Sequence, residues 1–372
     1  MGRMLAMVTD GFGGHGGIAR YNCDFLSALA AGNWQITVVP RYAPEPEVPP
    51  AGIDQRPARA GRMSYARTVC LEALWTRPRI VFCGHLFMAP LGVIAAKLAG
   101  AQLIIQTHGI EAWQRPGKLV RASSAAAALI LSVSRYTRAQ VLTWADVAPE
   151  RVVVLPNTFG AGFAPGPSPD RGRWGVAGRS VLLTVGRMDA REGYKGHEKV
   201  ICAMPALLAA GHDVVYLVVG EGDDRQRLER IAARCGVDER VRFVGAVSRD
   251  ALIELYRLAD LFVMPSGGEG FGIAYVEAMA CGTPALGLGF GGARDALGDG
   301  GLGIMVEPDE DLAARIGAAL TSPGLRGAAL AAAVESRFGP TRFAARACHL
   351  LERVEAARRG PVSGGTEGHC GR

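Results

Sequence analysis

Two glutamates on one glycine-rich segment carry the strongest chemical signal in the sequence. The segment reads Glu269-Gly-Phe-Gly-Ile-Ala-Tyr-Val-Glu277, which places one carboxylate on a loop and a second in the helix that the loop opens. Glycine lets the backbone approach a ligand closely, and the start of a helix offers N–H groups and a positive dipole end that suit a phosphate. The loop carboxylate can hold sugar hydroxyls and the helical one can hold ribose hydroxyls.

This segment belongs to a longer series of motifs. In chain order they are Val185-Gly-Arg187, Tyr194-Lys-Gly-His197, Gly220-Glu-Gly222, Val241-Arg-Phe-Val-Gly245 and Asp260-Leu-Phe-Val-Met-Pro-Ser266, and Ala278-Met-Ala-Cys-Gly-Thr-Pro284 follows Glu277. Their order resembles the donor site of retaining GT-B glycosyltransferases of family 4, and the resemblance covers nearly the whole chain. It implies an α/β fold with two Rossmann-like, doubly wound domains facing across a cleft. It also implies transfer of a hexose from a nucleotide sugar to an acceptor hydroxyl, with retention at the anomeric carbon.

The resemblance assigns roles to the candidate site residues. Arg187 and Lys195 are expected to clamp the diphosphate and to neutralise charge on the leaving nucleotide. Glu269 is assigned to hydroxyls of the donor sugar, Glu277 to the ribose, and His108 to positioning the sugar rather than to proton abstraction. Backbone contacts with the donor are expected from Gly16, Gly17, Gly186, Gly270, Phe271, Gly272, Ile273 and Ala274.

Expectations for the substrates also follow from the resemblance. The donor is a GDP- or UDP-linked sugar; mannose from a GDP donor is preferred, and UDP-glucose stays open. The acceptor is a glycan or a glycolipid, and a lipid-linked glycan in exopolysaccharide or lipopolysaccharide assembly is the hypothesis. No metal or other cofactor is expected, because cationic side chains and a helix dipole neutralise the leaving group in this family. Same-face substitution is expected, since no carboxylate is evident for a covalent sugar–enzyme intermediate.

Composition limits the classes of protein and of partner. The 372 residues suffice for two domains of ordinary size, and a hydrophobic content of 49% excludes a disordered chain. A net charge of +6 favours phosphorylated ligands or an anionic membrane surface as partners. Nucleic acid is not expected, because the basic residues are scattered and no basic run alternates with aromatic residues.

Cysteine usage and the absence of targeting signals predict the compartment. The eight cysteines form no CxxC pair, which predicts reduced, buried thiols in a cytosolic protein. No secretory signal and no run of about 20 apolar residues is visible. The expected location is therefore the cytoplasm, with peripheral binding to the inner membrane face if the acceptor is a lipid.

The elements that must position these residues alternate along the chain. Short apolar runs separated by longer helical stretches predict parallel strands buried between helices. The expected strands are 4–8, 36–39, 80–83, 103–106, 129–133 and 152–155, followed by 181–185, 214–219, 241–244, 261–264, 285–288 and 303–306. Because ligands bind at the carboxyl ends of such strands, His108 and Arg187 are expected at the site edge of their sheets.

A segment rich in proline and glycine, residues 156–169, divides the chain. We predict an N-terminal acceptor-side domain at 1–160, a linker at 161–178 and a nucleotide-sugar donor domain at 179–342. The family implies that a final helix, expected at 343–359, returns to the N-terminal domain, and the tail at 360–372 is predicted to be disordered. The family often reads Pro-Asn-Gly at the linker, whereas this chain reads Pro156-Asn-Thr158, so the turn after Asn157 must differ.

Other interpretations of these residues stay open. Glycines 11, 13 and 16 match G-x-G-x-x-G, but the second strand ends in Pro40-Arg-Tyr42 rather than in an acid. That difference argues against NAD and leaves an NADP oxidoreductase using Arg41. Glu269 lies on a loop and Glu277 in the helix that follows it, which suits ligand binding better than the flanking of a scissile bond that glycoside hydrolysis requires. A nucleotide-sugar 2-epimerase shares the architecture, and a nucleotide-sugar-binding protein without turnover could keep the whole site.

Four further polar residues have weaker assignments. Asp223 or Asp224 is expected as an N-cap or first-turn carboxylate of a helix at 225–235 rather than as a metal ligand. Glu111 is expected to be a solvated carboxylate, with an acceptor-side contact as the alternative. The loop between Arg187 and Lys195 is slightly longer than usual in the family, which leaves open whether Arg191 shares their role.

Overall fold

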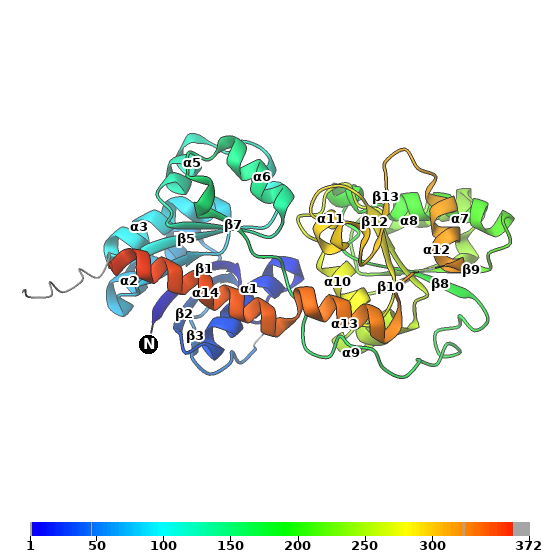
Figure 1. Ribbon diagram of the computed structural model, residues 1–372, viewed down its shortest axis with the longest axis horizontal. Coiled ribbons are helices and arrows are strands. Elements are labelled where there is room, and N and C mark those ends of the chain that lie inside the picture. Colours follow the sequence, from blue (N-terminus) through cyan, green and yellow to red (C-terminus); the bar gives the residue numbers. More distant parts are fainter. Residues whose placement is uncertain (1, 46, 323, 360–372) are drawn as a thin grey trace, which may run out of the picture.

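Two parallel β-sheets with helices on both faces build the two lobes of the molecule (Figure 1). The computed structural model describes residues 2–45, 47–322 and 324–359, and the predicted tail at 360–372 lies outside this part of the chain. The first sheet has the strand order β3-β2-β1-β4-β5-β6-β7, and the second has the order β10-β9-β8-β11-β12-β13. The predicted pair of Rossmann-like, doubly wound domains is confirmed.

All twelve expected strands are present, and a thirteenth was missed. The strands of the first sheet are β1 (Arg3–Asp10), β2 (Gln35–Tyr42), β3 (Ile53–Gln55), β4 (Ile80–Cys83), β5 (Gln102–Thr107), β6 (Leu129–Ser132) and β7 (Val152–Val154). Those of the second are β8 (Ser180–Val185), β9 (Val214–Val219), β10 (Val241–Gly245), β11 (Leu261–Met264), β12 (Ala285–Leu288) and β13 (Ile304–Val306). The missed strand, β3, is a short edge strand with no buried residue, so it lacks the apolar run that marks the others.

Helices separate most of the consecutive strands along the chain. The α-helices of the first half of the chain are α1 (Gly16–Ala31), α2 (Arg62–Thr76), α3 (Ala89–Ala99), α4 (Ile110–Trp113), α5 (Lys118–Ala125) and α6 (Arg135–Trp144). Those of the second half are α7 (His197–Ala209), α8 (Arg225–Arg234), α9 (Arg249–Leu258), α10 (Ile273–Ala280), α11 (Ala293–Ala296), α12 (Leu312–Thr321), α13 (Gly327–Phe338) and α14 (Pro340–Arg359). Short 3₁₀ turns are η1 (Leu86–Met88), η2 (Pro149–Arg151), η3 (Ala190–Lys195), η4 (Asp238–Arg240) and η5 (Gly298–Gly300).

The strand orders fix where a ligand can bind. In each sheet the order reverses once, between β1 and β4 in the first and between β8 and β11 in the second. Loops on either side of such a reversal diverge and leave a crevice at the carboxyl ends of the strands. The loop after β8 contains Arg187 and Lys195, and the loop after β11 contains Glu269. His108 directly follows β5, at the corresponding edge of the first sheet.

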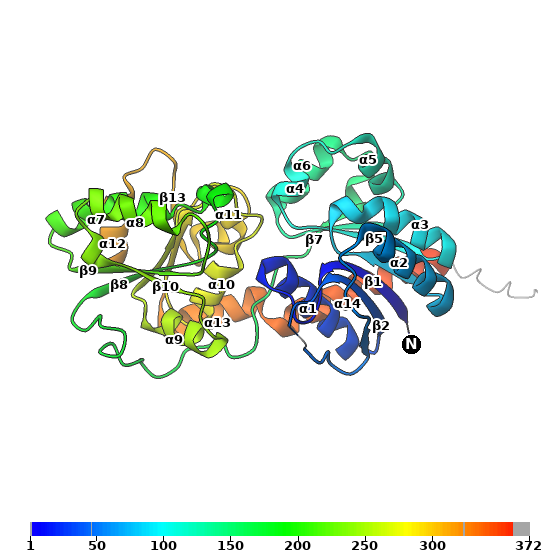
Figure 2. The same cartoon turned by 180° about the vertical axis from the view of Figure 1, so that it is seen from behind.

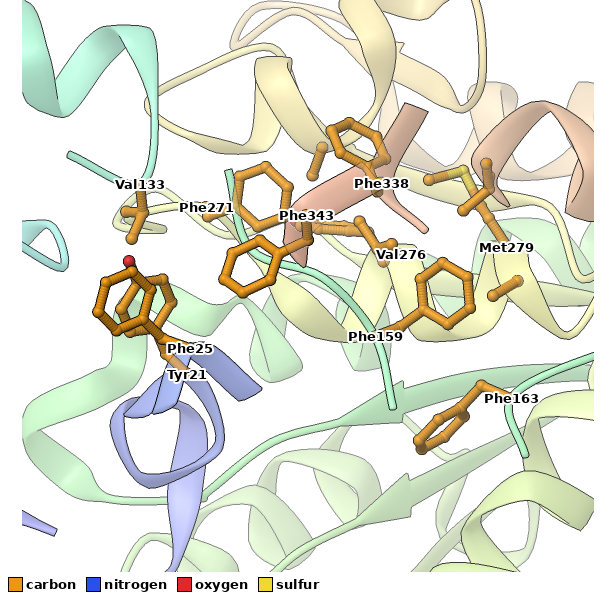
Figure 3. Packing of buried hydrophobic residues seen from close by; sticks show 14 of the residues in the cluster. Tyr21, Phe25, Val133, Phe159, Phe163, Phe271, Val276, Met279, Phe338 and Phe343 are labelled. Carbon is orange, nitrogen blue, oxygen red and sulfur yellow. The ribbon is translucent and has the colours of Figure 1, made fainter. Parts of the chain in front are cut away.

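One hydrophobic cluster runs from one lobe into the other. It joins side chains of α1 and α14 to side chains of α9, α10 and α13. Figure 3 shows Tyr21, Phe271, Phe338 and Phe343 gathered where the lobes meet, with Phe159 of the connecting chain beside them. The Phe271 and Phe338 rings pack edge to face with centroids 5.5 Å apart. Burying aromatic rings from both lobes in one cluster stabilises their association.

The chain crosses between the lobes twice, once after β7 and once between α13 and α14 (Figure 1). Helix α14 lies against α1 of the first lobe, as both views show (Figure 2). Arg346 of α14 donates to the carbonyl oxygen of Val154, 3.0 Å away, and Arg79 pairs with Glu355. The final helix therefore packs on the N-terminal lobe. It begins at Pro340, three residues before the expected 343.

The expectation of buried thiols needs correction. Only Cys83 and Cys281 are buried among the described cysteines, whereas Cys202 is exposed. The thiols are free, as expected, but they are not all core residues, because several lie on partly exposed helix faces.

Asp224 occupies the N-cap of α8, as expected. Its carboxylate pairs with Arg227 and makes no side-chain hydrogen bond to the helix backbone. No helix of the described residues is long and apolar enough to cross a bilayer.

Candidate active site

An ion pair between Lys195 and Glu269 lies at the reversal point of the second sheet. Lys195 Nζ is 3.1 Å from Glu269 Oε1, and both side chains are largely buried. Ser266 Oγ donates to the same Oε1 at 3.2 Å and accepts from the N–H of Gly268. No described residue donates a hydrogen bond to Glu269 Oε2. That oxygen can therefore accept from a ligand hydroxyl without breaking an existing contact.

Lys195 stays protonated in this setting. Burial lowers its pKa, but the charges of Glu269 and Glu192 and the nearby Tyr194 raise it by more, so that the net shift is upward. The Tyr194 ring also lies 5.6 Å from the ammonium group, within cation–π range. The lysine stem passes over Gly186, where a Cβ atom would meet Lys195 Cδ at 3.3 Å. The ammonium group is thus a fixed positive charge at the carboxyl end of β8.

Arg187 is less firmly placed than Lys195. Its guanidinium pairs with Glu192, and its side chain is 69% exposed. Glu192 Oε2 lies 3.9 Å from Lys195 Nζ, so one carboxylate joins the two cations of the expected diphosphate clamp. Arg191 has an exposed side chain, and its backbone N–H is capped by Asp189. Arg187 is free to swing toward a phosphate once it releases Glu192.

Helix α10 begins directly beside this ion pair. Its N-cap is Gly272, whose φ of +93° lies in the left-handed region that favours glycine. The N–H groups of the first turn and the positive end of the dipole therefore lie next to Lys195 and Glu269, as a diphosphate site requires. Phe271 turns its ring into the hydrophobic cluster, so only its backbone is available to a ligand. Ile273 and Ala274 are partly buried in the first turn.

Glu277 lies in α10 and faces the junction of the lobes. Burial raises its pKa to about 7, against the hydrogen bond from Tyr256 and the charges of Arg20 and Arg249, which lower it. The Tyr256 hydroxyl donates to Glu277 Oε2 at 3.0 Å. Arg20 belongs to α1 of the first lobe, where it pairs with Asp24. The carboxyl group is thus close to its protonation midpoint at neutral pH.

His108 belongs to the first lobe and lies across the junction of the lobes from the Glu269 loop. Its Nε2 lies 2.8 Å from the carbonyl oxygen of Gly84, and its ring packs edge-on against Tyr21 with centroids 5.2 Å apart. A carbonyl oxygen can only accept, so Nε2 carries the proton. Burial lowers the His108 pKa, while Glu111 and the Gly84 carbonyl raise it by less and His85 lowers it further. A neutral ring with its proton on Nε2 leaves Nδ1 as an acceptor for a sugar hydroxyl.

The loops of the two lobes touch through glycines. A Cβ atom on Gly109 would lie 2.6 Å from the Cα of Gly270, and one on Gly270 would overlap the carbonyl oxygen of His108. On its other side, Gly270 is covered by Gly292, whose N–H donates to the Glu269 carbonyl oxygen at 2.8 Å. Only glycine allows backbone to approach backbone this closely. This contact places the His108 turn and the Glu269 loop next to each other at the junction of the lobes.

A second contact between the lobes combines polar and aromatic side chains. Arg135, at the first position of α6, donates to Asp295 of the other lobe through its backbone N–H at 2.7 Å and through its guanidinium. The guanidinium also donates to both oxygens of Asp299, at 2.7 and 2.9 Å. Phe290 packs against both Trp113 and Tyr136, with centroid distances of 6.4 and 5.3 Å. We call these residues the interlobe contact.

The glycine turn of the first lobe lies across from α10. Gly16 has a φ of +89° and faces open space, and a Cβ on Gly17 would meet only Ile273 Cδ1, at 3.9 Å. The structure thus brings Gly17 to the donor side, where the sequence expected backbone approach. Arg41 instead donates to the carbonyl oxygen of Ala60. Glu111 accepts from the backbone N–H of His108 rather than lying free in solvent.

Several functional candidates were missing from the sequence-based set. Ser266, Glu192 and Tyr194 surround the Lys195–Glu269 pair, and Gly292 supports Gly270. Ser266 carried a signal, because it ends the motif that leads into the glycine-rich loop. Glu192 also lies inside a segment of interest, the loop between Arg187 and Lys195. Nothing local marks Gly292 or Arg135, whose roles come only from contacts between the lobes.

Comparison with known proteins identifies the family of the chain. The family model "Glycosyltransferase Family 4" matches residues 15–159, and "Glycosyl transferases group 1" matches residues 170–334. The chain is 31% identical over 234 residues to the GDP-mannose-dependent alpha-(1-6)-phosphatidylinositol monomannoside mannosyltransferase of Mycolicibacterium smegmatis, a match covering 59% of this chain and 60% of that relative. It is 28% identical over 334 residues to the protein of the same name from Mycobacterium tuberculosis, covering 82% and 86%.

A solved structure shows the same fold at low sequence identity. HepE of Anabaena, crystallised in complex with UDP, superposes with a TM-score of 0.77 at 20% identity, over 94% of this chain and 100% of that one. The two family models together account for most of both lobes. The chain belongs to the glycosyltransferases of family 4, with the GT-B fold. It is a glycosyltransferase.

Replacing Arg135 should loosen the lobes. In Arg135→Ala, the buried Asp295 loses its guanidinium partner and Asp299 loses both of its hydrogen bonds, which destabilises the interlobe contact. Small-angle X-ray scattering should show a larger radius of gyration than for the wild type. Arg173→Ala, which breaks the exposed Arg173–Glu254 pair within one lobe, is the matched control and should leave it unchanged. Equal radii for wild type and Arg135→Ala would contradict a role in holding the lobes.

The raised pKa of Glu277 predicts a pH-dependent stability. The folded state keeps a proton up to about pH 7 that the unfolded chain loses near pH 4.5. The free energy of unfolding therefore falls as the pH rises through this window. The free energy of unfolding of Glu277→Gln minus that of the wild type should be more positive at pH 8 than at pH 5. Denaturant unfolding at both pH values measures this difference. Tyr256→Phe removes a contact that lowers this pKa and should move the transition to higher pH. A wild-type-to-Gln difference independent of pH would contradict the assignment.

Proposed function

We propose that the protein transfers a hexose from a nucleoside-diphosphate sugar to an acceptor hydroxyl, with retention at the anomeric carbon. The observation that carries the proposal is the Lys195–Glu269 pair at the start of α10, brought against the His108 loop by the glycine contact. The second lobe supplies positive charge for a diphosphate and an anionic acceptor, Glu269, for a sugar hydroxyl, and the first lobe supplies a neutral acceptor, His108. These are the two groups that a nucleotide sugar presents.

Each residue has a defined part in this reaction. Lys195, Arg187 and the first turn of α10 stabilise the negative charge that develops on the leaving diphosphate. Glu269 Oε2 and His108 Nδ1 accept hydrogen bonds from the sugar and fix its orientation. Glu277 holds the ribose. The acceptor hydroxyl gives its proton to the leaving diphosphate on the same face of the sugar, so no enzyme carboxylate needs to attack the anomeric carbon.

These side chains also explain how a metal ion could be dispensed with. The leaving group meets a buried ammonium, a guanidinium that can swing in, and a helix N-terminus. Together they place positive charge where a divalent cation would otherwise act. We therefore propose that transfer proceeds without a metal or other cofactor, with the nucleotide sugar as the bound cosubstrate.

The relatives give a preference for the donor. Both mycobacterial relatives are named as GDP-mannose-dependent mannosyltransferases, which favours GDP-mannose and mannosyl transfer here. HepE was crystallised with UDP, so a UDP-linked hexose is the second candidate. The backbone contacts at α10 would hold the diphosphate of either donor.

The acceptor side rests on the first lobe. The relatives' names include a phosphatidylinositol mannoside, which favours a glycolipid or lipid-linked glycan, as in exopolysaccharide or lipopolysaccharide assembly. Large apolar side chains of this lobe are exposed, among them Met63, Phe87 and Leu119, and basic residues such as Arg62 and Lys118 are their neighbours in sequence. This composition fits a cytoplasmic enzyme that works at an anionic membrane face.

Three variants and a nucleotide screen test this proposal. GDP or UDP should raise the melting temperature of the wild type, because a ligand that binds only the folded state stabilises it. Lys195→Ala should lower release of nucleotide from GDP-mannose or UDP-glucose, assayed with a lipid extract as acceptor source, by about 100-fold. Glu269→Gln should keep the nucleotide-induced shift and lose most turnover. Lys199→Ala changes an exposed lysine on α7 and should behave as wild type. Full turnover in Glu269→Gln would rule out its contact with the sugar.

A further inference from the structure

A second pocket opens where the chain crosses between the lobes. It is small and open to solvent, and it is lined from both crossings. The first crossing contributes Leu155, Pro156 and Asn157, and the second contributes Arg337, Phe338, Arg342, Phe343 and Arg346. None of the donor-site residues lines it. We call it the crossing pocket.

Three arginines line this pocket, and no carboxylate does. Arg337 lies close enough to Asp299 to lower the pKa of that carboxyl group, whereas no described carboxylate forms an ion pair with Arg342 or Arg346. Arg346 donates to the Val154 carbonyl oxygen at 3.0 Å and Arg342 to the Ser336 carbonyl oxygen at 3.2 Å, so each keeps further N–H donors. Burial and the neighbouring Arg342 lower the pKa of Arg346. Like charges held together in this way are stabilised by an anion.

Asn157 adds a polar group that has no partner. Its side chain is 8% exposed, and Oδ1 forms no hydrogen bond. Buried polar atoms are rarely left unsatisfied, so such an atom on a pocket wall indicates a missing partner. Rotating the carboxamide by a half-turn exchanges Oδ1 and Nδ2, which lets Asn157 accept from a hydroxyl or donate to an oxyanion.

We propose that the crossing pocket binds the phosphate group of a hydroxyl-bearing phosphate ester. The guanidinium groups of Arg342 and Arg346 present paired N–H donors that match phosphate oxygens. The N-terminus of α14, at Pro340, adds the positive end of a helix dipole beside them. Asn157 takes the ester's hydroxyl. The source of the group is either a soluble phosphate ester or the headgroup of a lipid, since both present the same chemistry.

Binding at this position would act on the arrangement of the lobes. The pocket wall combines the chain that leaves β7 with the start of α14, the two segments through which the lobes are joined. Thr158 already ties them, since its hydroxyl donates to the Phe338 carbonyl oxygen at 2.7 Å. A phosphate held between Asn157 and Arg342 would be a second such tie. The ligand thereby adds a contact between the two segments that join the lobes.

Phosphate titrations of matched variants test the site. The probe is inorganic phosphate at low ionic strength, followed by calorimetry on the full chain. Arg342→Gln and Arg346→Gln should each weaken binding by about tenfold, the usual loss for a charge-assisted hydrogen bond. Arg353→Gln removes the same charge from an exposed position two turns further along α14, outside the pocket, and should change the dissociation constant by less than about twofold. Lys195→Ala, which disables the donor site, should leave this binding in place.

The source of the phosphate is settled by a second arm. Phosphatidylcholine vesicles with and without phosphatidic acid are mixed with the same variants, and bound protein is separated by flotation. Retention by phosphatidic acid that is lost in Arg346→Gln but kept in Arg353→Gln assigns the pocket to a lipid headgroup; phosphate binding without retention assigns it to a soluble ester. Equal weakening in Arg353→Gln, loss of phosphate binding in Lys195→Ala alone, or no binding in either arm would overturn the proposal.

Discussion

The close backbone contact of Gly109, Gly270 and Gly292 is the constraint on which the site depends. A Cβ atom at Gly109 would lie 2.6 Å from Gly270 Cα, and side chains at the other two positions would overlap neighbouring backbone. The His108 turn and the Glu269 loop can meet only because these positions carry no side chain. In the proposed reaction, contact with the sugar requires both loops, since the first lobe supplies the imidazole and the second supplies the carboxylate. The aromatic cluster around Phe271 and the interlobe contact at Arg135 hold the lobes in this arrangement.

Each cation of the candidate active site is paired with a carboxylate of the protein. Lys195 pairs with Glu269 and Arg187 with Glu192, so the largely buried Lys195 does not bear the full cost of an unpaired buried charge. A diphosphate can take over these cations and release the two carboxylates, one of which is then available to the sugar. The pocket at the crossing lacks any such internal balance. In the candidate active site, a ligand would replace carboxylates that already pair with the cations. In the crossing pocket, a ligand would replace no carboxylate of the pocket wall.

The sequence predicted those parts of the molecule that local pattern determines. Apolar β-branched runs gave twelve strands, and the carboxyl ends of β5, β8 and β11 gave His108, Arg187 and Glu269 their places. The edge strand β3 escaped because its residues are not buried. The exposure of Arg187 and its pairing with Glu192 were not predictable, because both depend on how the chain folds through η3, which places Glu192 beside Arg187 and Lys195. The roles of Gly292, Arg135 and Tyr256 arise from contacts between distant segments, which no single stretch of sequence encodes.

The most direct test of the central claim is the ratio of sugar transfer to nucleotide affinity in Gly109→Ala. Gly109 lies in the first lobe with a φ of +147°, and its substitution should push the His108 turn away from Gly270 without altering the donor lobe. Gly117→Ala is the control, because this glycine has a φ of −59° and no atom within 4 Å of an added Cβ. The account predicts that Gly109→Ala binds nucleotide like the wild type and loses sugar transfer, while Gly117→Ala keeps both. Undiminished transfer in Gly109→Ala would show that the two loops need not meet for the reaction.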